Sequence, residues 1–261
     1  MSRGLDADGY IAREGSLDRV PPSFAGAVVA LQRQLPATGL HSAYLYGSVP
    51  RGNAVPGESD LDALLALDHA PTDEDRAWAK AAERRIDAAF PQVNGVGILL
   101  ESAEVLLSEL ERHDMGWFIA CLCTPLEGPD LAEQLPRYRP DSLLARETNG
   151  DLAPALPRWR ERLASDADLL PLARGASRKL VRTGFTLVMP RWGGWTSDLD
   201  ESVEAFAAYY PEHAEQLRAA ARLGREPVAD RALLTELIDD FGPWLAAEYE
   251  KEHGTKAPRP D

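Results

Sequence analysis

The sequence predicts an α+β protein, in which a small domain with a mixed sheet is followed by an all-helical domain. Three observations predict this class. Short apolar runs alternate with amphipathic segments in the first half of the chain. A run rich in proline and arginine follows at residues 135–140. Beyond that run the apolar residues recur at helical spacing, so we expect the domains to span residues 1–140 and 141–261.

The elements of the first domain are predicted in chain order. Residues 1–20 are polar and of mixed charge, and we expect a loose lead-in. The first helix is expected to start in Pro21-Pro22-Ser23, with Ser23 as its cap. Then come strands at residues 40–46 and 60–67, a helix from Thr72 or Asp73 to Phe90, a strand at 93–100 and a short helix at 102–110. The run 117–123 fits either a strand or a buried helix.

The second domain is predicted to contain helices throughout, at residues 142–147, 151–164, 171–189, 199–209, 212–223 and 229–252. No apolar run approaches the roughly eighteen residues of a membrane helix, and no apolar signal core follows Met1. The two cysteines, Cys121 and Cys123, are too few for a disulfide framework. We expect them to be two side chains on one face of a strand rather than a metal site. These features predict a cytoplasmic protein without a membrane partner.

The net charge of −14 restricts the class of partner. Nucleic-acid phosphates favour a basic surface, so the charge argues against a nucleic-acid partner, including RNA ends as acceptors. The same charge suits a cationic small molecule, or serves solubility alone. For the oligomeric state, a monomer or a homodimer is expected.

Residues suited to ligand binding or catalysis are concentrated between the first two predicted strands. Gly47 permits a sharp turn, and Ser48 follows where backbone N–H groups and a hydroxyl suit a phosphate. The next segment is kept out of regular structure by Pro50, Gly52, Pro56 and Gly57. Asp60 and Asp62 are one residue apart, so on a strand they share a face. Two adjacent carboxylates suit a hard cation such as Mg²⁺, which also binds substrate phosphates.

This stretch resembles the signature of the nucleotidyltransferase superfamily related to DNA polymerase beta. The matching residues are Gly47, Ser48, Arg51, Gly52, Ser59, Asp60 and Asp62. The alternative is an ordinary connection with two exposed aspartates, which leaves the rest of the pattern unexplained. The second half, through a diffuse pattern at residues 178–212, resembles the helical domain of aminoglycoside adenylyltransferases. Those antibiotic-resistance enzymes modify streptomycin and spectinomycin.

The resemblance implies a function and a site. ATP and Mg²⁺ are expected on the first domain, and the acceptor hydroxyl is expected to be presented from a cleft between the domains. Asp60 and Asp62 are implied as the catalytic residues and metal ligands. Nucleotide contacts are implied for Gly47, Ser48, Arg51 and Ser59.

One feature of that family is missing from the sequence. Such enzymes usually carry a third carboxylate on the next strand, where it completes the metal site or acts as general base. The predicted strand 93–100 contains no Asp or Glu, and Glu101 lies roughly 15–20 Å along the strand from Gly95. Three explanations stay open. The base comes from the helical domain, or two aspartates and a metal suffice, or the protein binds nucleotide without transferring it.

The second half offers candidate partners for the nucleotide. Residues 171–191 hold five basic residues and no acidic one. Arg174, Arg178 and Arg182 form one helical stripe with Lys179 beside it. Arg178, Lys179 and Arg182 are predicted to bind the triphosphate, and the resemblance favours Arg182. The alternative is a solvated helix face.

The loop that follows offers candidates for the acceptor. Trp192 and Trp195 enclose a Gly-Gly turn and are predicted to stack on a base, a sugar or a cation. The alternative is that they anchor the loop to the core. Asp198 and Asp200 are predicted to receive amino groups or supply the base, unless they are only a solvated first helical turn.

The sequence therefore predicts a nucleotidyltransferase that moves AMP from ATP to a hydroxyl of a small, amine-bearing acceptor. The alternative is a catalytically reduced nucleotide-binding or regulatory protein.

Overall fold

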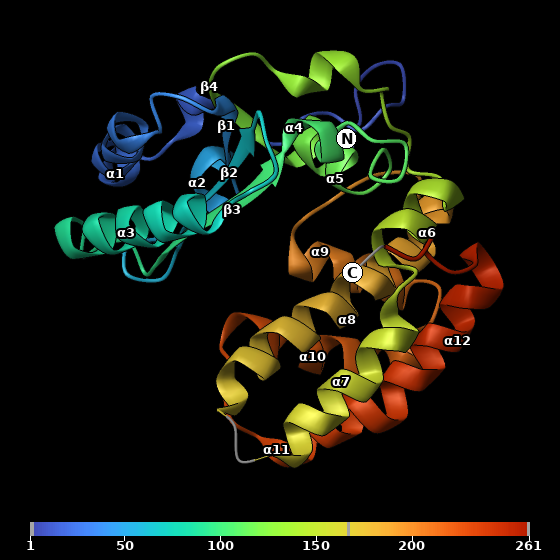
Figure 1. Ribbon diagram of the computed structural model, residues 1–261. Coiled ribbons are helices and arrows are strands. Elements are labelled where there is room, and N and C mark those ends of the chain that lie inside the picture. The colour runs from blue at the N-terminus through green and yellow to red at the C-terminus, as the bar shows by residue number, and fades with distance from the viewer. Residues whose placement is uncertain (1–2, 166–167, 260–261) are drawn as a thin grey trace. The chain divides into compact units, whose positions relative to one another are not determined.

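The computed structural model describes residues 3–165 and 168–259. The chain divides into two compact units, of which one is Ala12–Tyr138 and the other combines Met1–Ile11 with Arg139–Asp261. The first unit carries the sheet, and the second is built from helices (Figure 1). The predicted α+β class is therefore confirmed.

The sheet of the first unit has four strands in the order β3-β2-β1-β4. The strands are β1 (Leu40–Tyr46), β2 (Leu61–Leu67), β3 (Val96–Ser102) and β4 (Thr124–Glu127). β1 is antiparallel to both of its neighbours, whereas β2 and β3 are parallel. A parallel pair needs a long crossover, which here is α3 (Asp73–Ala89). The mixed sheet is the one that the sequence predicts.

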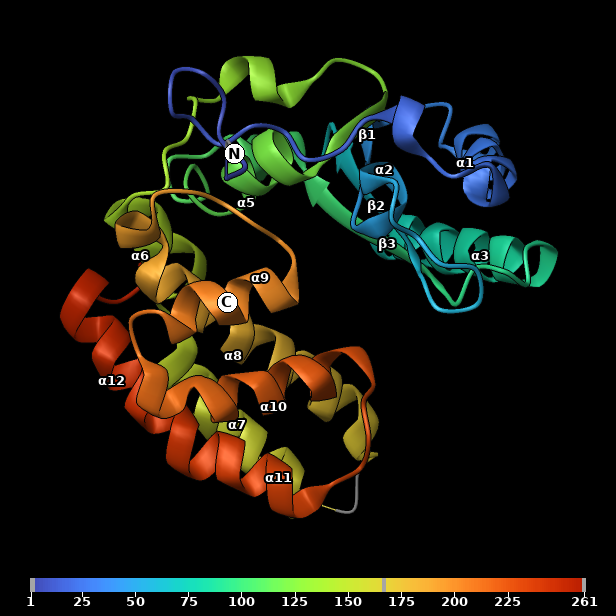
Figure 2. The same cartoon turned by 180° about the vertical axis from the view of Figure 1, so that it is seen from behind.

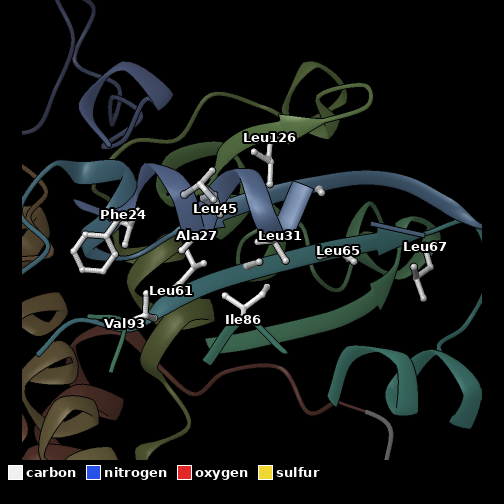
Figure 3. Packing of buried hydrophobic residues seen from close by; sticks show 14 residues of the cluster. Phe24, Ala27, Leu31, Leu45, Leu61, Leu65, Leu67, Ile86, Val93 and Leu126 are labelled. Carbon is white, nitrogen blue, oxygen red and sulfur yellow. The ribbon is translucent and has the colours of Figure 1, made fainter. Parts of the chain in front are cut away.

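The two faces of this sheet are covered by different elements. On one face, α1 (Pro22–Gln34) and α3 bury alternate side chains of β1 and β2, as Figure 3 shows. Fully buried members of this cluster are Phe24, Leu31, Leu45, Leu61, Leu65 and Ile86. Each such side chain contributes about 1.5–3 kcal/mol on leaving water. On the other face, Tyr44, Leu64 and Ala66 pack with a second cluster that includes Ile119 and Leu131. Because strand side chains alternate, Asp60 and Asp62 belong to this second face.

Local capping signals explain where several elements begin. Thr72 caps α3 in a capping box with Asp75, as its position predicts. Ser102 caps the short helix α4 (Ala103–Leu106) by accepting from the Val105 amide. The expected cap Ser23 is wrong: α1 starts two residues earlier than that cap implies, because Pro21 is the N-cap and Pro22 the first helical residue.

In the same unit, one further prediction is wrong, one open alternative is decided and one strand was not expected. β3 starts at Val96 rather than at residue 93, because the Asn94 amide donates to Ser59 O in a loop. The structure decides the alternatives for residues 117–122 in favour of a helix: α5 (Met115–Trp117) continues into the π-helical turn η2 (Phe118–Leu122), so Cys121 does not lie on a strand. β4 was not expected, because four residues containing a proline give no alternation to detect.

The second unit is organised around the long helix α8 (Leu169–Trp192). Its partners are α6 (Ser142–Asn149), α7 (Leu152–Ala164), α9 (Leu199–Ala207), α10 (Ala214–Arg225) and α12 (Gly242–His253), as Figures 1 and 2 show. The predicted helix 229–252 is divided into α11 (Arg231–Thr235), the π-helical turn η5 (Glu236–Phe241) and α12. Among the helices within the described ranges, none is long and apolar enough to cross a membrane.

Candidate functional site

The turn after β1 is built around a glycine with an unusual backbone. Gly47 has φ 81°, a value that side chains disfavour, and it caps the single-turn helix α2 (Ser48–Arg51). Gly52, with φ 83°, ends that turn. Pro50 lies inside α2, so the expectation that it prevents regular structure is wrong at this position. The irregular segment starts only after Gly52.

Asp62 lies beside this turn, and Asp60 comes directly before β2. Tyr46 pairs with Asp62 across β1 and β2, and Gly97 pairs with Asp62 across β2 and β3. A Cβ atom built on Gly97 would lie 3.0 Å from Asp62 Oδ1, and one built on Gly47 would lie 3.1 Å from Asp62 Oδ2. The Asp62 carboxylate is thus flanked closely by two glycine backbones. Asp60 has more room, since a Cβ on Gly95, the residue before β3, would lie 3.6 Å from Asp60 Oδ1.

The donor set at this position fits Mg²⁺ bound together with a substrate. Within residues 3–165 and 168–259, no group of three or more His, Cys, Asp or Glu side chains is arranged to hold a metal ion. Mg²⁺ in nucleotide sites is commonly held by one or two carboxylates, with substrate phosphates and waters as the other ligands. Two neighbouring aspartates next to half-buried glycine backbone are compatible with that arrangement.

The strand register accounts for the missing third carboxylate. Gly97 is the β3 residue opposite Asp62, whereas Glu101 is opposite Ala66. Four residues of strand separate Gly97 from Glu101, which is about 13 Å. The Glu101 carboxylate accepts from the Ser102 amide at 2.8 Å. β3 therefore presents glycine backbone, and not an acid, to Asp62.

Two further predicted nucleotide contacts have structural partners within the site. Arg51 Nε donates to Gly47 O at 3.0 Å, and its Nη1 lies 3.5 Å from Glu14 Oε2. Ser59 Oγ accepts from the Val55 amide at 2.9 Å and closes the loop before β2. A direct nucleotide contact for either residue stays a prediction.

Sequence reasoning missed Glu14, which lies in the segment expected to be loose. That expectation is wrong for residues 12–19, where the Glu14 amide donates to Cys121 O at 2.9 Å and the Ser16 amide donates to Pro50 O at 3.0 Å. A single acidic residue in a polar stretch carries no pattern that would identify it.

In the helical unit, the predicted phosphate ligands belong to α8. Arg178 Nε donates to Gly224 O at 2.9 Å, and Lys179 forms an ion pair with Asp151 at 2.5 Å. Burial opposes ionisation of Asp151, but the Lys179 ammonium beside it holds the pKa of that carboxyl below its usual value. Arg182 is exposed. Arg178 and Lys179 therefore link α8 to neighbouring segments, and triphosphate binding by all three residues stays a prediction.

The two tryptophans pack against the end of the same helix. The rings of Trp192 and Trp195 each meet Phe185 edge-on, with centroids 5.5 and 5.6 Å from it. The Trp195 amide donates to Arg3 O at 2.8 Å, and the Arg3 guanidinium lies 4.9 Å from the Trp192 ring. Trp195 is buried and Trp192 is half-buried. These contacts are those of loop anchors, and a stacking role stays a prediction.

The two acidic candidates lie at the start of α9. Asp198 caps this helix and accepts from the amides of Asp200 and Glu201, each at 2.9 Å. Asp200 forms an ion pair with Arg225 of α10 at 2.6 Å. The structure thus explains both side chains locally, and their contact with an acceptor stays a prediction.

The structure thus combines a mixed sheet, which carries the Gly-Ser turn and the Asp-x-Asp segment, with a unit built from helices. Among solved structures, the chain is similar to spectinomycin adenyltransferase AAD(9) from Enterococcus faecialis, whose crystal structure contains ATP and spectinomycin. The TM-score is 0.58 at 15% identity, over 86% of this chain and 98% of that chain. No protein-family model and no curated protein matches the sequence. At this identity the similarity establishes a shared fold, as the sequence resemblance predicts.

Proposed function

We propose that this protein is a nucleotidyltransferase that moves AMP from ATP to a hydroxyl of a small, amine-bearing acceptor. The observation that carries the proposal is the pair of Asp60 and Asp62 on one face beside the Gly47 turn. Adjacent carboxylates repel each other and add nothing to a core. A cation bound together with a triphosphate would offset this repulsion. The fold shared with spectinomycin adenyltransferase supports the same assignment.

In this proposal, residues 1–140 bind the nucleotide and residues 141–261 bind the acceptor. Ser48 and the backbone after Gly47 hold phosphate oxygens. The acceptor oxygen bonds to the α-phosphorus while the bond from that phosphorus to the bridging oxygen breaks, which releases pyrophosphate. The hydroxyl proton passes to a base, for which Asp198 and Asp200 are the candidates, or to water. Arg178, Lys179 and Arg182 offset the charge of the phosphates.

Asp60 and Asp62 are the residues that would hold Mg²⁺. When bound there, Mg²⁺ supplies charge neutralisation to the phosphate oxygens. The carboxylates would determine where the ion lies, because β2 and the flanking glycines fix the positions of their oxygens.

The acceptor is the less constrained half of the proposal. A net charge of −14 favours a cationic molecule. Trp192 and Trp195 are proposed to stack on it, and Asp198 and Asp200 to receive its amino groups. Spectinomycin is the first compound to test, because the similar adenyltransferase was crystallised with it.

A second candidate is a nucleotide-binding protein that performs no transfer. The observation in its favour is Gly97, which faces Asp62 from β3 and brings no carboxylate that accepts the hydroxyl proton. Both candidates require the triphosphate to bind at Asp60 and Asp62, and they differ only in the release of pyrophosphate.

Calorimetric titration with ATP, GTP, CTP and UTP, each with Mg²⁺, tests the common part. We expect metal-dependent micromolar binding that is lost in the double variant Asp60→Asn/Asp62→Asn. Asp68→Asn is the control for loss of a charge beside β2, because Asp68 follows β2 directly and is exposed. It removes one of the two charges that the double variant loses. Absence of binding by every triphosphate contradicts both candidates. With binding established, pyrophosphate release on adding amine-bearing acceptors supports transfer, and binding without release by any of them favours the second candidate.

A further inference from the structure

The segment of residues 12–19 is bound to the elements that surround the Gly47 turn. Its contacts reach η2, α2 and the chain after β4, and they include both backbone hydrogen bonds and an ion pair. They are Arg13 Nε to Ala120 O (3.1 Å), Arg13 Nη1 to Asp130 Oδ2 (2.8 Å), Glu14 N to Cys121 O (2.9 Å), Ser16 N to Pro50 O (3.0 Å) and Arg19 Nη1 to Glu14 O (2.8 Å). The two backbone hydrogen bonds, from the amides of Glu14 and Ser16, fix the backbone position of Glu14.

The Glu14 side chain points from this segment to Arg51. Their charged atoms are 3.5 Å apart, with 16% of the Glu14 side chain and 26% of the Arg51 side chain exposed. The same guanidinium donates through Nε to Gly47 O at 3.0 Å. A guanidinium is a rigid planar fork, so a carboxylate that engages Nη1 also restricts where Nε points. Glu14 thereby favours the arginine orientation that holds the Gly47 carbonyl.

Gly47 in turn is next to Asp62. A Cβ atom at Gly47 would lie only 3.1 Å from Asp62 Oδ2, so a small shift of this turn changes the space around that carboxylate. The contacts form a continuous series from Glu14 through Arg51 and Gly47 to Asp62. The last member is one of the two proposed metal ligands.

We infer that Glu14 is a positioning residue for the nucleotide site. It acts through Arg51, whose guanidinium holds the Gly47 turn against Asp62. This inference rests on the proposed function for its consequence on nucleotide binding, whereas the effect on the turn is measurable without any ligand.

The test uses the full-length chain and four variants: Glu14→Gln, Arg51→Gln, the double variant, and Arg13→Gln as control. Arg13 is a matched control because it lies in the same segment, forms an ion pair with Asp130 and has 28% of its side chain exposed. The first readout is hydrogen exchange of the amides of Gly52 and Asn53, which close α2 by donating to Val49 O and Ser48 O. The second is calorimetric binding of Mg²⁺ with the triphosphate that the wild type binds.

We expect Glu14→Gln to accelerate exchange of these two amides about fivefold and to weaken triphosphate binding about fivefold. This is the size of effect expected when a partly buried ion pair is lost. The double variant should behave like Arg51→Gln alone, because both residues act through one contact. Arg13→Gln should lower the melting temperature and leave both readouts at wild-type values.

Wild-type exchange in Glu14→Gln, or equal acceleration in Arg13→Gln, overturns the inference irrespective of any ligand. Faster exchange with unchanged triphosphate binding also overturns it, because the turn then moves without effect on the site. If the wild type binds no triphosphate, the proposed function fails, while exchange alone still decides whether Glu14 holds the turn.

Discussion

Replacing Gly97 with alanine asks whether the position of the Asp62 carboxylate matters to a bound ligand. The added methyl group would lie 3.0 Å from Asp62 Oδ1, which is shorter than the 3.4 Å at which ordinary contact begins. The backbone of Gly97 lies outside the left-handed region, so alanine adopts it without strain. Alanine reduces the conformational entropy of the unfolded chain relative to glycine, which stabilises the folded protein by about 0.4–1 kcal/mol. This gain offsets the cost of moving the half-buried Asp62 carboxylate by a few tenths of an ångström.

We therefore expect a free energy of unfolding within about 1 kcal/mol of the wild type. Metal-dependent nucleotide binding should respond differently. Mg²⁺ demands near-ideal octahedral geometry, so a displaced ligand oxygen is poorly tolerated. Changes of this kind beside a metal ligand typically reduce affinity by about 10–100-fold. The prediction is a protein of normal stability with strongly weakened triphosphate binding.

Calorimetry with Mg²⁺ and ATP, together with thermal unfolding, measures both effects. Gly95→Ala is the control, because its methyl group would lie 3.6 Å from Asp60 Oδ1, an ordinary contact. It should bind nucleotide as the wild type does. Wild-type affinity in Gly97→Ala, or an equal loss in both variants, would refute the reasoning that the space between Gly97 and Asp62 serves the ligand.

Three further predictions concern the structure around the site and in the helical unit. Thr72→Ala should lower the free energy of unfolding by about 1 kcal/mol at pH 7. Hydrogen bonds from Thr72 hold the pKa of Asp75 at about 2. Part of the difference between Thr72→Ala and the wild type should therefore disappear as the pH falls from 4 towards 2 and Asp75 is protonated. Burial lowers the pKa of His253, so wild-type stability should decline as the pH falls below about 6.5, and His253→Gln should remove that decline. Burial raises the pKa of Cys121 to about 12 and that of Cys123 well above its usual value, so a thiol reagent at pH 8 should label neither before unfolding.

Each of these predictions has a specific contrary result. For Thr72→Ala, urea unfolding that shows the same difference at pH 2 and pH 7 would contradict the role of the Asp75 charge. The His253 interpretation depends on two contacts, from Ser142 Oγ at 2.7 Å and to Leu187 O at 3.0 Å. It fails if melting temperatures of the wild type and His253→Gln fall in parallel between pH 7.5 and pH 5. Rapid labelling of a cysteine in the folded protein would show that the η2 segment opens readily.

Much of the architecture followed from local signals. β1 starts and ends at the predicted residues because Leu40–Tyr46 is short, apolar and bounded by glycines at both ends. α3 begins after Thr72, one of the two caps predicted, since a cap is made within four residues. β4 and the helical character of Phe118–Leu122 were missed or undecided, because short segments of this kind depend on the strands and side chains that cover them.

The candidate site, too, was predictable from the sequence only in part. Spacing alone placed Asp60 and Asp62 on one face, because the side-chain period of a strand is two. Spacing could not reveal that Gly97 faces Asp62, because a parallel register between separate strands is set by packing across the crossover helix.

The sequence by itself determined the Gly-Ser turn, the aspartate pair and the helical second half, because each is written in neighbouring residues. Only the tertiary structure decided that Glu14 reaches Arg51, that Arg51 holds Gly47, and that glycines of two other segments flank Asp62. Those contacts join residues far apart in the chain, and their partners are selected by the packing of the whole unit rather than by any local preference.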